Sequence, residues 1–299
     1  MVTETDLALP GGRTLHVYDT GGSARLTVFW HHGTPNTGAP PGPLLPLARE
    51  LGVRWVSFDR PGYRTSTPVP GRTVGNAAEC VSAVADALGI GEFALMGHSG
   101  GSSHALACAA RLPERVVAVA ALAAVAPFDA EGLDWFGGMA AASAASLRAA
   151  TEGRAAKEKY EAAAEFDPDV FTAADFAALK GSWSWLDEVV RAALAGGPGG
   201  LIDDDLAYVT PWGADPARIG APVLLVHGEQ DRMIPASHSA WLARRCPDAE
   251  YRPTPGDGHL SVLSHAAGAL TWLAGHSRAS DATTGPGPVT STTPASRPM

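Results

Sequence analysis

Short apolar runs alternate with segments of helical periodicity over the first 122 residues and again after residue 222. The apolar runs are rich in β-branched and aromatic residues and predict buried strands. They are Leu26–His31, Val53–Phe58, Phe93–Met96, Val116–Leu122 and Val223–Val226, with a further strand near Tyr251 and a hairpin over Leu7–Tyr18. Apolar positions three and four apart predict helices: a short one ending near Glu50, then Thr73–Gly89, Ser102–Arg111, Ala236–Arg245 and Ala266–Leu273. The alternation predicts an α/β fold, with a mostly parallel central sheet and helices on both faces.

The alternation stops between residues 128 and 212, where the chain is Ala-rich, helix-like and without an evident strand. We therefore expect a sheet domain formed by residues 1–127 and 213–277, interrupted by a helical insertion at 128–212. Residues 278–299 are dominated by Ser, Thr, Pro and Gly and are expected to form a disordered tail.

Composition narrows the class of protein. The 299 residues carry a formal net charge of −9 and no basic block, which argues against a nucleic-acid or anionic-membrane partner. No apolar run approaches membrane-spanning length, and the acidic N-terminus lacks the features of a secretory signal. Three cysteines, Cys80, Cys108 and Cys246, cannot all pair and lack metal-ligand spacing, which suits a cytoplasmic protein without a metal site. The sequence leaves the oligomeric state open.

The five residues from Gly97 to Gly101 read Gly-His-Ser-Gly-Gly and lie between a predicted strand and a predicted helix. Small residues two before and two after Ser99 permit a sharp turn that exposes the serine hydroxyl at the end of the strand. The N-terminus of the following helix points at the same place, where it favours developing negative charge. This context indicates a nucleophilic serine, although a helix-capping serine would give the same local pattern.

Several further motifs follow the other predicted strands: His-Gly-Thr-Pro at 32–35, Asp-Arg-Pro-Gly-Tyr at 59–63, His-Gly-Glu-Gln-Asp at 227–231 and Gly-His at 258–259. With the Ser99 turn, they occur in the order typical of α/β-hydrolase fold enzymes, which the chain resembles from about Leu7 to His276. The resemblance implies the α/β-hydrolase fold with an inserted helical cap, as many relatives carry. One departure is Arg64, where the family often has glycine after the Asp-x-Pro-Gly-Tyr type of segment.

A serine hydroxyl needs a base, and the base needs an orienting carboxylate. The order Ser, Asp, His along the chain is the one that this fold uses. We expect Ser99 as nucleophile, His259 as base and Asp231 as acid, with Asp129 as the second choice of acid. His238, His265 and His276 fall in helical or terminal segments and fit the role of base less well, and Glu229 is expected to point elsewhere.

The resemblance places the oxyanion-binding donors at the backbone N–H groups of Thr34 and Gly100. His32 either braces this loop or simply ends a strand, and His98 is expected to pack rather than react. Four aromatic side chains of the insertion are candidates for lining a substrate pocket, with packing onto the core as the alternative: Trp135, Phe136, Trp183 and Trp185. The run Asp203–Asp205 is interpreted as a solvated turn or helix start.

These features favour a cofactor-free serine hydrolase that cleaves a small-molecule carboxylic ester, thioester or lactone through an acyl-enzyme on Ser99. One alternative is the cofactor-free perhydrolase or haloperoxidase-like activity of some relatives, which uses the same three residues. Another is a slow-turnover ligand receptor on the same fold. A serine nucleophile argues against epoxide hydrolases and haloalkane dehalogenases, which use aspartate.

Overall fold

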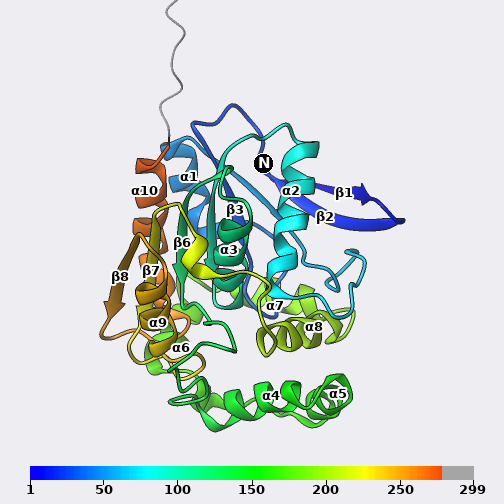
Figure 1. Cartoon of the computed structure of the whole chain (residues 1–299), viewed down its shortest axis with the longest axis vertical. Helices are drawn as coiled ribbons and strands as arrows, with labels where there is room; N and C mark the ends of the chain where they lie inside the picture. Colours follow the sequence, from blue (N-terminus) through cyan, green and yellow to red (C-terminus); the bar gives the residue numbers. More distant parts are fainter. Residues whose placement is uncertain (278–299) are drawn as a thin grey trace, which may run out of the picture.

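An eight-stranded sheet with the order β1-β2-β4-β3-β5-β6-β7-β8 organises the computed structural model, which describes residues 1–277 (Figure 1). The strands are β1 (Thr3–Leu9), β2 (Arg13–Asp19), β3 (Leu26–His31), β4 (Val53–Phe58), β5 (Phe93–His98), β6 (Val116–Leu122), β7 (Val223–Gly228) and β8 (Ala249–Thr254). The pairs β1–β2 and β2–β4 are antiparallel, and β3 to β8 pair in parallel. The predicted fold class is confirmed, and the predicted hairpin begins four residues earlier, at Thr3.

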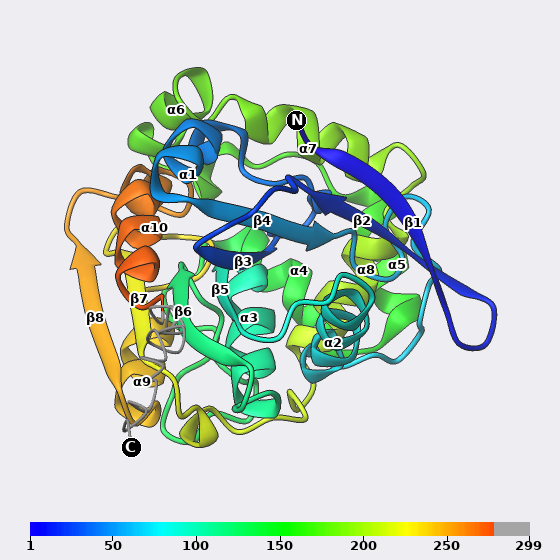
Figure 2. The ribbon, with the colours of Figure 1, turned by 90° about the horizontal axis from the view of Figure 1, so that it is seen from above.

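Helices cover both faces of the sheet (Figure 2). One face carries α2 (Ala77–Ala87), α3 (Gly100–Arg111) and α9 (Ser237–Arg245), and the other carries α1 (Leu45–Leu51) and α10 (Ala266–Gly275). Successive strand side chains enter opposite layers: Leu95 belongs to the first apolar cluster, whereas Ala94 and Met96 belong to the second. Both layers are apolar, which explains why the central strands read as continuous apolar runs.

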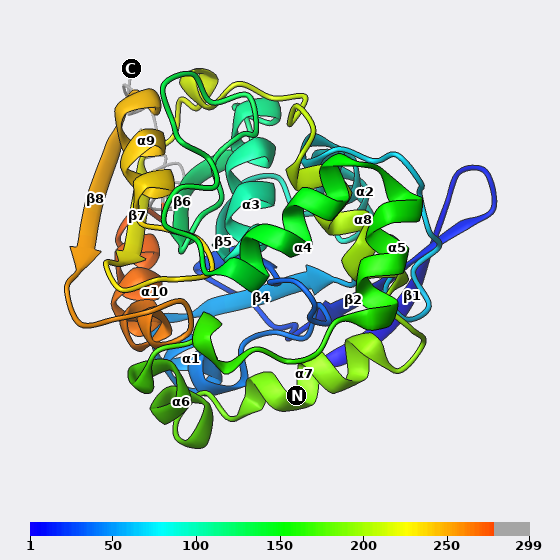
Figure 3. The same ribbon diagram turned by 90° about the horizontal axis from the view of Figure 1, so that it is seen from below.

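Five helices lie between β6 and β7 in the chain: α4 (Ala141–Thr151), α5 (Arg154–Ala163), α6 (Ala173–Lys180), α7 (Trp185–Leu194) and α8 (Gly199–Tyr208). Among the described residues, no strand interrupts this segment. Seen from below, α4 and α5 lie in front of the sheet, and α6 and α7 lie along one side of it (Figure 3). The domain boundaries at 127/128 and 212/213 stay predictions, and the expected tail at 278–299 lies outside the described residues.

Short 3-10 turns complete the described chain: Gly42–Leu44, Val74–Asn76, Pro168–Val170, Pro216–Arg218 and Ser261–His265. The predicted helix Thr73–Gly89 is therefore a 3-10 turn followed by α2. All three cysteines are buried and unpaired. Of the helices in residues 1–277, none combines the length and the apolarity needed to cross a membrane.

Candidate active site

Three polar side chains meet at the carboxyl edge of the parallel sheet. Ser99 follows β5, Asp231 follows β7, and His259 lies in the loop after β8. Ser99 Oγ is 2.9 Å from His259 Nε2, and His259 Nδ1 is 2.7 Å from Asp231 Oδ2. The structure thus brings together the three residues that the sequence placed in one site, although 160 positions separate Ser99 from His259.

The turn at Ser99 forces its backbone to φ 56° and ψ −132°, a region that side-chain-bearing residues rarely occupy. The turn closes because its neighbours lack side chains. An added Cβ at Gly97 would lie 2.5 Å from the carbonyl carbon of Gly101, and one at Gly101 would collide with the carbonyl oxygen of His31. The strained turn holds the serine hydroxyl at the mouth of the site.

Hydrogen bonds fix Asp231 and its protonation state. Its Oδ1 accepts the backbone N–H groups of Met233 and Ile234, each at 2.9 Å. Burial opposes ionisation, but His259, His227 and their hydrogen bonds outweigh it and hold the pKa of Asp231 well below its usual range. Asp231 is therefore an anion that accepts the Nδ1–H of His259.

This anion also sets the state of His259. Burial lowers the pKa of the imidazole, but the Asp231 carboxylate opposes that effect more strongly, so the net pKa of His259 is raised. With Nδ1–H donated to Asp231, the neutral ring presents an unprotonated Nε2 to the Ser99 hydroxyl. This arrangement can accept the serine proton.

Two other histidines support the site without reaching Ser99. His227 Nε2 is 2.8 Å from the carbonyl oxygen of Ile234 and 3.2 Å from Asp231 Oδ2, so this nitrogen carries the proton. His98 Nε2 donates to the carbonyl oxygen of His259 at 2.9 Å, and burial lowers the pKa of His98 to about 3. His98 therefore packs, as expected.

The other candidate acids and bases lie elsewhere. Asp129 and Glu229 are exposed, and neither lines a cavity beside Ser99. His238 bonds the backbone of Ala126 and Trp135, His265 pairs with Asp257, and His276 packs against Trp272 with the two rings tilted.

The loop that carries Thr34 is braced from behind by buried charge, a feature that the sequence did not reveal. Arg60 donates to the carbonyl oxygens of His32 and Gly33 and to Thr34 Oγ1. Arg60 also pairs with Asp204 at 2.6 Å, and Asp204 accepts the Thr34 hydroxyl at 2.6 Å. His32 lies just after β3 and accepts the backbone N–H of Arg60 through Nε2, so it braces the loop rather than ending the strand.

The interpretation of the run Asp203–Asp205 as solvated is wrong, because all three residues are buried within α8. Each aspartate has a cationic partner on another element: Asp203 pairs with Arg154, Asp204 with Arg60 and Arg72, and Asp205 with Lys157. Burial raises the pKa of Asp205 to about 6, although Lys157 opposes the shift. Paired burial explains how so polar a segment packs against the core.

Two cavities meet at Ser99. The larger, about 620 Å³, is lined by His259 and by apolar side chains such as Leu179, Leu186 and Val190. The smaller, about 330 Å³, is lined by Gly100, Tyr208 and Asp205 among others. The residues common to both are Thr34, Ser99, Phe166, Val170 and Met233.

The expectation that four aromatic residues line the pocket is wrong, since none of them lines either cavity. Trp135 is buried, donates to the carbonyl oxygen of Ala126 and packs on Phe136. Trp183 joins the apolar layer that contains α1 and α10, and Trp185 packs on it and against Gly42. Trp135 and Trp183 thus pack the insertion against the core. Phe166, which is 70% exposed, lines both cavities beside Ser99 instead.

A carboxylate from the insertion also holds the loop that carries His259. Asp175, on α6, accepts the backbone N–H groups of Leu260 at 2.8 Å and Ser261 at 2.7 Å. Its other oxygen caps its own helix by accepting from Thr172. No sequence signal distinguished Asp175 from an ordinary capping residue.

Comparison with known proteins agrees with this architecture. The model of the alpha/beta hydrolase fold family matches residues 27–266, and the chain belongs to that family. The chain is 30% identical, over 86% of its length, to the dihydrolipoyllysine-residue acetyltransferase component of the acetoin cleaving system of Pseudomonas putida, but the match spans only 64% of that protein. It is 27% identical to the bifunctional esterase/perhydrolase of Acinetobacter calcoaceticus, over 73% of this chain and 78% of the relative.

Solved structures show the same fold. A thermophilic esterase from Thermogutta terrifontis superposes with a TM-score of 0.66 at 20% identity, covering 92% of this chain and all of that one. At 20% identity, the similarity of this esterase to the chain supports a shared fold alone.

Proposed function

We propose that this protein is a serine hydrolase that cleaves a carboxylic ester, thioester or lactone through an acyl-enzyme on Ser99. The observation that carries the proposal is the pair of hydrogen bonds that joins Ser99 Oγ to His259 and His259 to Asp231, at 2.9 and 2.7 Å. His259 takes the serine proton as Oγ attacks the substrate carbonyl. It then returns that proton to the departing oxygen or sulfur, and water activated by the same imidazole releases the acid.

The tetrahedral oxyanion would be bound by the N–H groups of Gly100 and Thr34. Gly100 is the first residue of α3, so helix geometry gives its N–H no acceptor within the helix. Thr34 lines both cavities beside Ser99, and Arg60 and Asp204 brace its loop. Such preorganised donors contribute roughly 3 kcal/mol each to transition-state stabilisation.

The two cavities suggest how a substrate lies. His259 must reach the leaving group to protonate it, and His259 lines the larger cavity but not the smaller. We therefore assign the leaving group to the apolar 620 Å³ cavity and the acyl group to the 330 Å³ cavity. An ester with a bulky apolar alcohol and a shorter acyl group fits this division.

A fluorophosphonate probe tests the nucleophile directly. We expect stoichiometric labelling at Ser99, identified by peptide mass spectrometry, and loss of both labelling and ester turnover in Ser99→Ala. Ser102→Ala is the matched control, because Ser102 lies one turn of backbone away and donates to the carbonyl oxygen of Leu122. An intact protein that stays unlabelled at Ser99 would refute the proposal.

A perhydrolase is the second candidate, favoured by the similarity to the bifunctional esterase/perhydrolase of Acinetobacter calcoaceticus. In that reaction hydrogen peroxide replaces water in attacking the acyl-enzyme and gives a peracid. Assays with and without peroxide on the same ester distinguish the two activities.

A further inference from the structure

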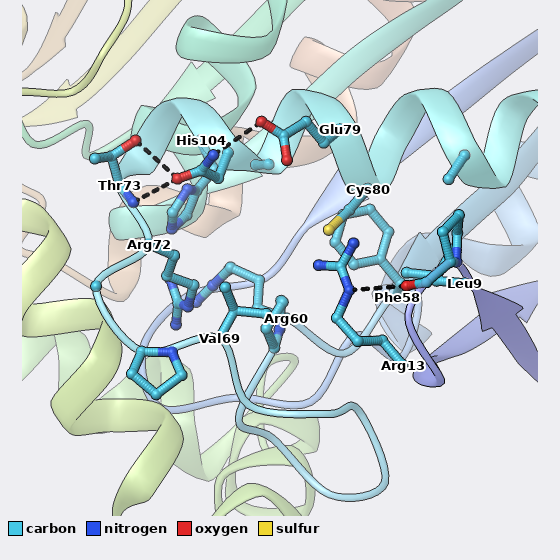
Figure 4. Close-up of a pocket in the computed structure, with 17 residues that line it drawn as sticks. Leu9, Arg13, Phe58, Arg60, Val69, Arg72, Thr73, Glu79, Cys80 and His104 are labelled. Atoms are coloured by element: carbon cyan, nitrogen blue, oxygen red, sulfur yellow. Dashed lines mark hydrogen bonds between the residues drawn. The ribbon is translucent and has the colours of Figure 1, made fainter.

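A separate cavity of about 350 Å³ lies on the other side of the Arg60 network, between α2, the tip of the β1–β2 hairpin and residues 58–73 (Figure 4). It shares no lining residue with the two cavities beside Ser99. Much of its wall is apolar and includes Leu9, Phe58, Val69 and Cys80. It is therefore a compartment of its own rather than an extension of the candidate active site.

Positive charge gathers at one end of this cavity. Arg60 and Arg72 are 2% and 6% exposed, and each pairs with Asp204 at 2.6 Å. His104 lies 3.7 Å from the same carboxylate, but burial lowers its pKa to about 4, so it is neutral. Two buried guanidinium groups thus share one carboxylate, which leaves one positive charge without a counterion in this cluster.

The same end of the cavity also contains an unpaired hydrogen-bond donor. Arg72 Nε–H is buried and has no hydrogen-bond partner, whereas the neutral His104 donates through Nδ1 to the carbonyl oxygen of Val74 at 3.1 Å and supplies no further donor. A buried cation and an unpaired donor are costly unless a ligand satisfies them. The uncompensated positive charge and the unpaired donor therefore point to an anion as the missing partner.

The mouth of the cavity adds a third arginine. Figure 4 shows Arg13 on the side opposite Arg72 and His104. The acidic side chain in the wall is Glu79, which is already engaged by Asn76 at 2.9 Å and by Arg111 at 3.7 Å. The charge facing the cavity is therefore net positive.

We propose that this cavity binds a small organic carboxylate, with its anionic group at Arg72 and its apolar body against Phe58, Val69 and Cys80. A guanidinium matches the planar geometry of a carboxylate. The apolar wall favours a ligand with a hydrocarbon body over a free, fully hydrated inorganic anion. The volume lies at the lower end of the range for small-molecule sites.

Isothermal titration calorimetry with octanoate, and with octanol as the uncharged analogue, tests this site. We expect octanoate to bind the wild-type protein at least about tenfold more tightly than octanol. Arg72→Gln should remove that preference. Because Arg72 is buried and its loss can unfold the chain, Ala83→Trp provides a second test: it fills the cavity from α2 and should abolish binding.

Two controls locate the bound ligand. Val190→Trp obstructs the larger cavity beside Ser99 and should leave octanoate binding unchanged, as should Arg25→Gln at an exposed arginine outside the cavity. Equal affinity for octanol, binding that survives Ala83→Trp, loss of binding in Val190→Trp, or no heat at millimolar octanoate would each overturn the proposal. Because the readout is binding and not turnover, its failure is distinct from failure of the proposed hydrolase chemistry.

Discussion

Asp231 shows how much of the candidate site depends on one side chain. Its two oxygens fix the turn at Met233 and Ile234, orient His259 and accept a weaker contact from His227. The sequence identified Asp231 by its position after a late strand. It could not reveal the supporting pair His227 and Ser239, because their contact at 2.6 Å arises only when α9 packs against β7.

The pH dependence of turnover tests this arrangement. Because the pKa of His259 is raised above 6.5 and only the neutral ring accepts the serine proton, kcat/KM should fall as pH decreases through a midpoint above 6.5. Asp231→Asn removes the carboxylate that raises this pKa, so the midpoint should move to lower pH. We also expect kcat to fall on the order of 10³-fold or more.

Stopped-flow or steady-state assays across the pH range measure both effects. Asp129→Asn is the matched control, since that carboxylate is exposed and outside the site. An acid limb that does not move in Asp231→Asn would contradict the assigned role of Asp231.

At the scale of elements, the turn between β5 and α3 is determined by close approach of backbone to backbone. The motif Gly97–Gly101 predicted this turn from sequence because glycine spacing reports local sterics. The helix starts at Gly100, two residues before the expected Ser102, so that its first N–H groups face the site. Local patterns thus predicted the strand, turn and helix.

The element-scale prediction compares two glycines. Gly101→Ala should destabilise the protein by about 3 kcal/mol or more, because the new methyl group meets the carbonyl oxygens of His31 and His32. Gly268→Ala, on the exposed side of α10 with nothing within 4 Å, should instead stabilise by about 0.5–1 kcal/mol. Urea unfolding measures both free energies, and equal stabilities for the two variants would be inconsistent with a turn set by backbone contact.

At the scale of the molecule, the mostly parallel sheet and the helices on its two faces follow from the alternation of strands and helices, but the order of the strands and the contacts of the inserted helices do not. Its pairing of Asp203–Asp205 with cations from α5 and from the β4–α2 segment depends on contacts up to 144 positions apart. Aromatic residues in the sequence suggested a pocket, yet packing of the insertion uses Trp135 and Trp183. Sequence periodicity predicts which apolar residues are buried but not which cavity they face.

The division of the site into two cavities gives a prediction about ester selectivity. Val190→Trp should lower kcat/KM for esters of bulky apolar alcohols by at least about tenfold while changing the methyl ester of the same acid little. Ala142→Phe, in the smaller cavity, should have the opposite selectivity and penalise long acyl chains. A panel of esters that varies one side at a time measures the two effects, and identical losses across the panel would contradict the assignment of the cavities.

The hydrogen bonds of Asp175 join the loop that carries His259 to α6. Replacing this region with the equivalent segment of a relative, in order to change selectivity, should therefore also alter proton transfer. The exception is a segment that places an equivalent acceptor beside the N–H groups of Leu260 and Ser261. Under the proposed mechanism, substrate selectivity and turnover both depend on this contact, and laboratory evolution of one should repeatedly recover compensating changes beside the other.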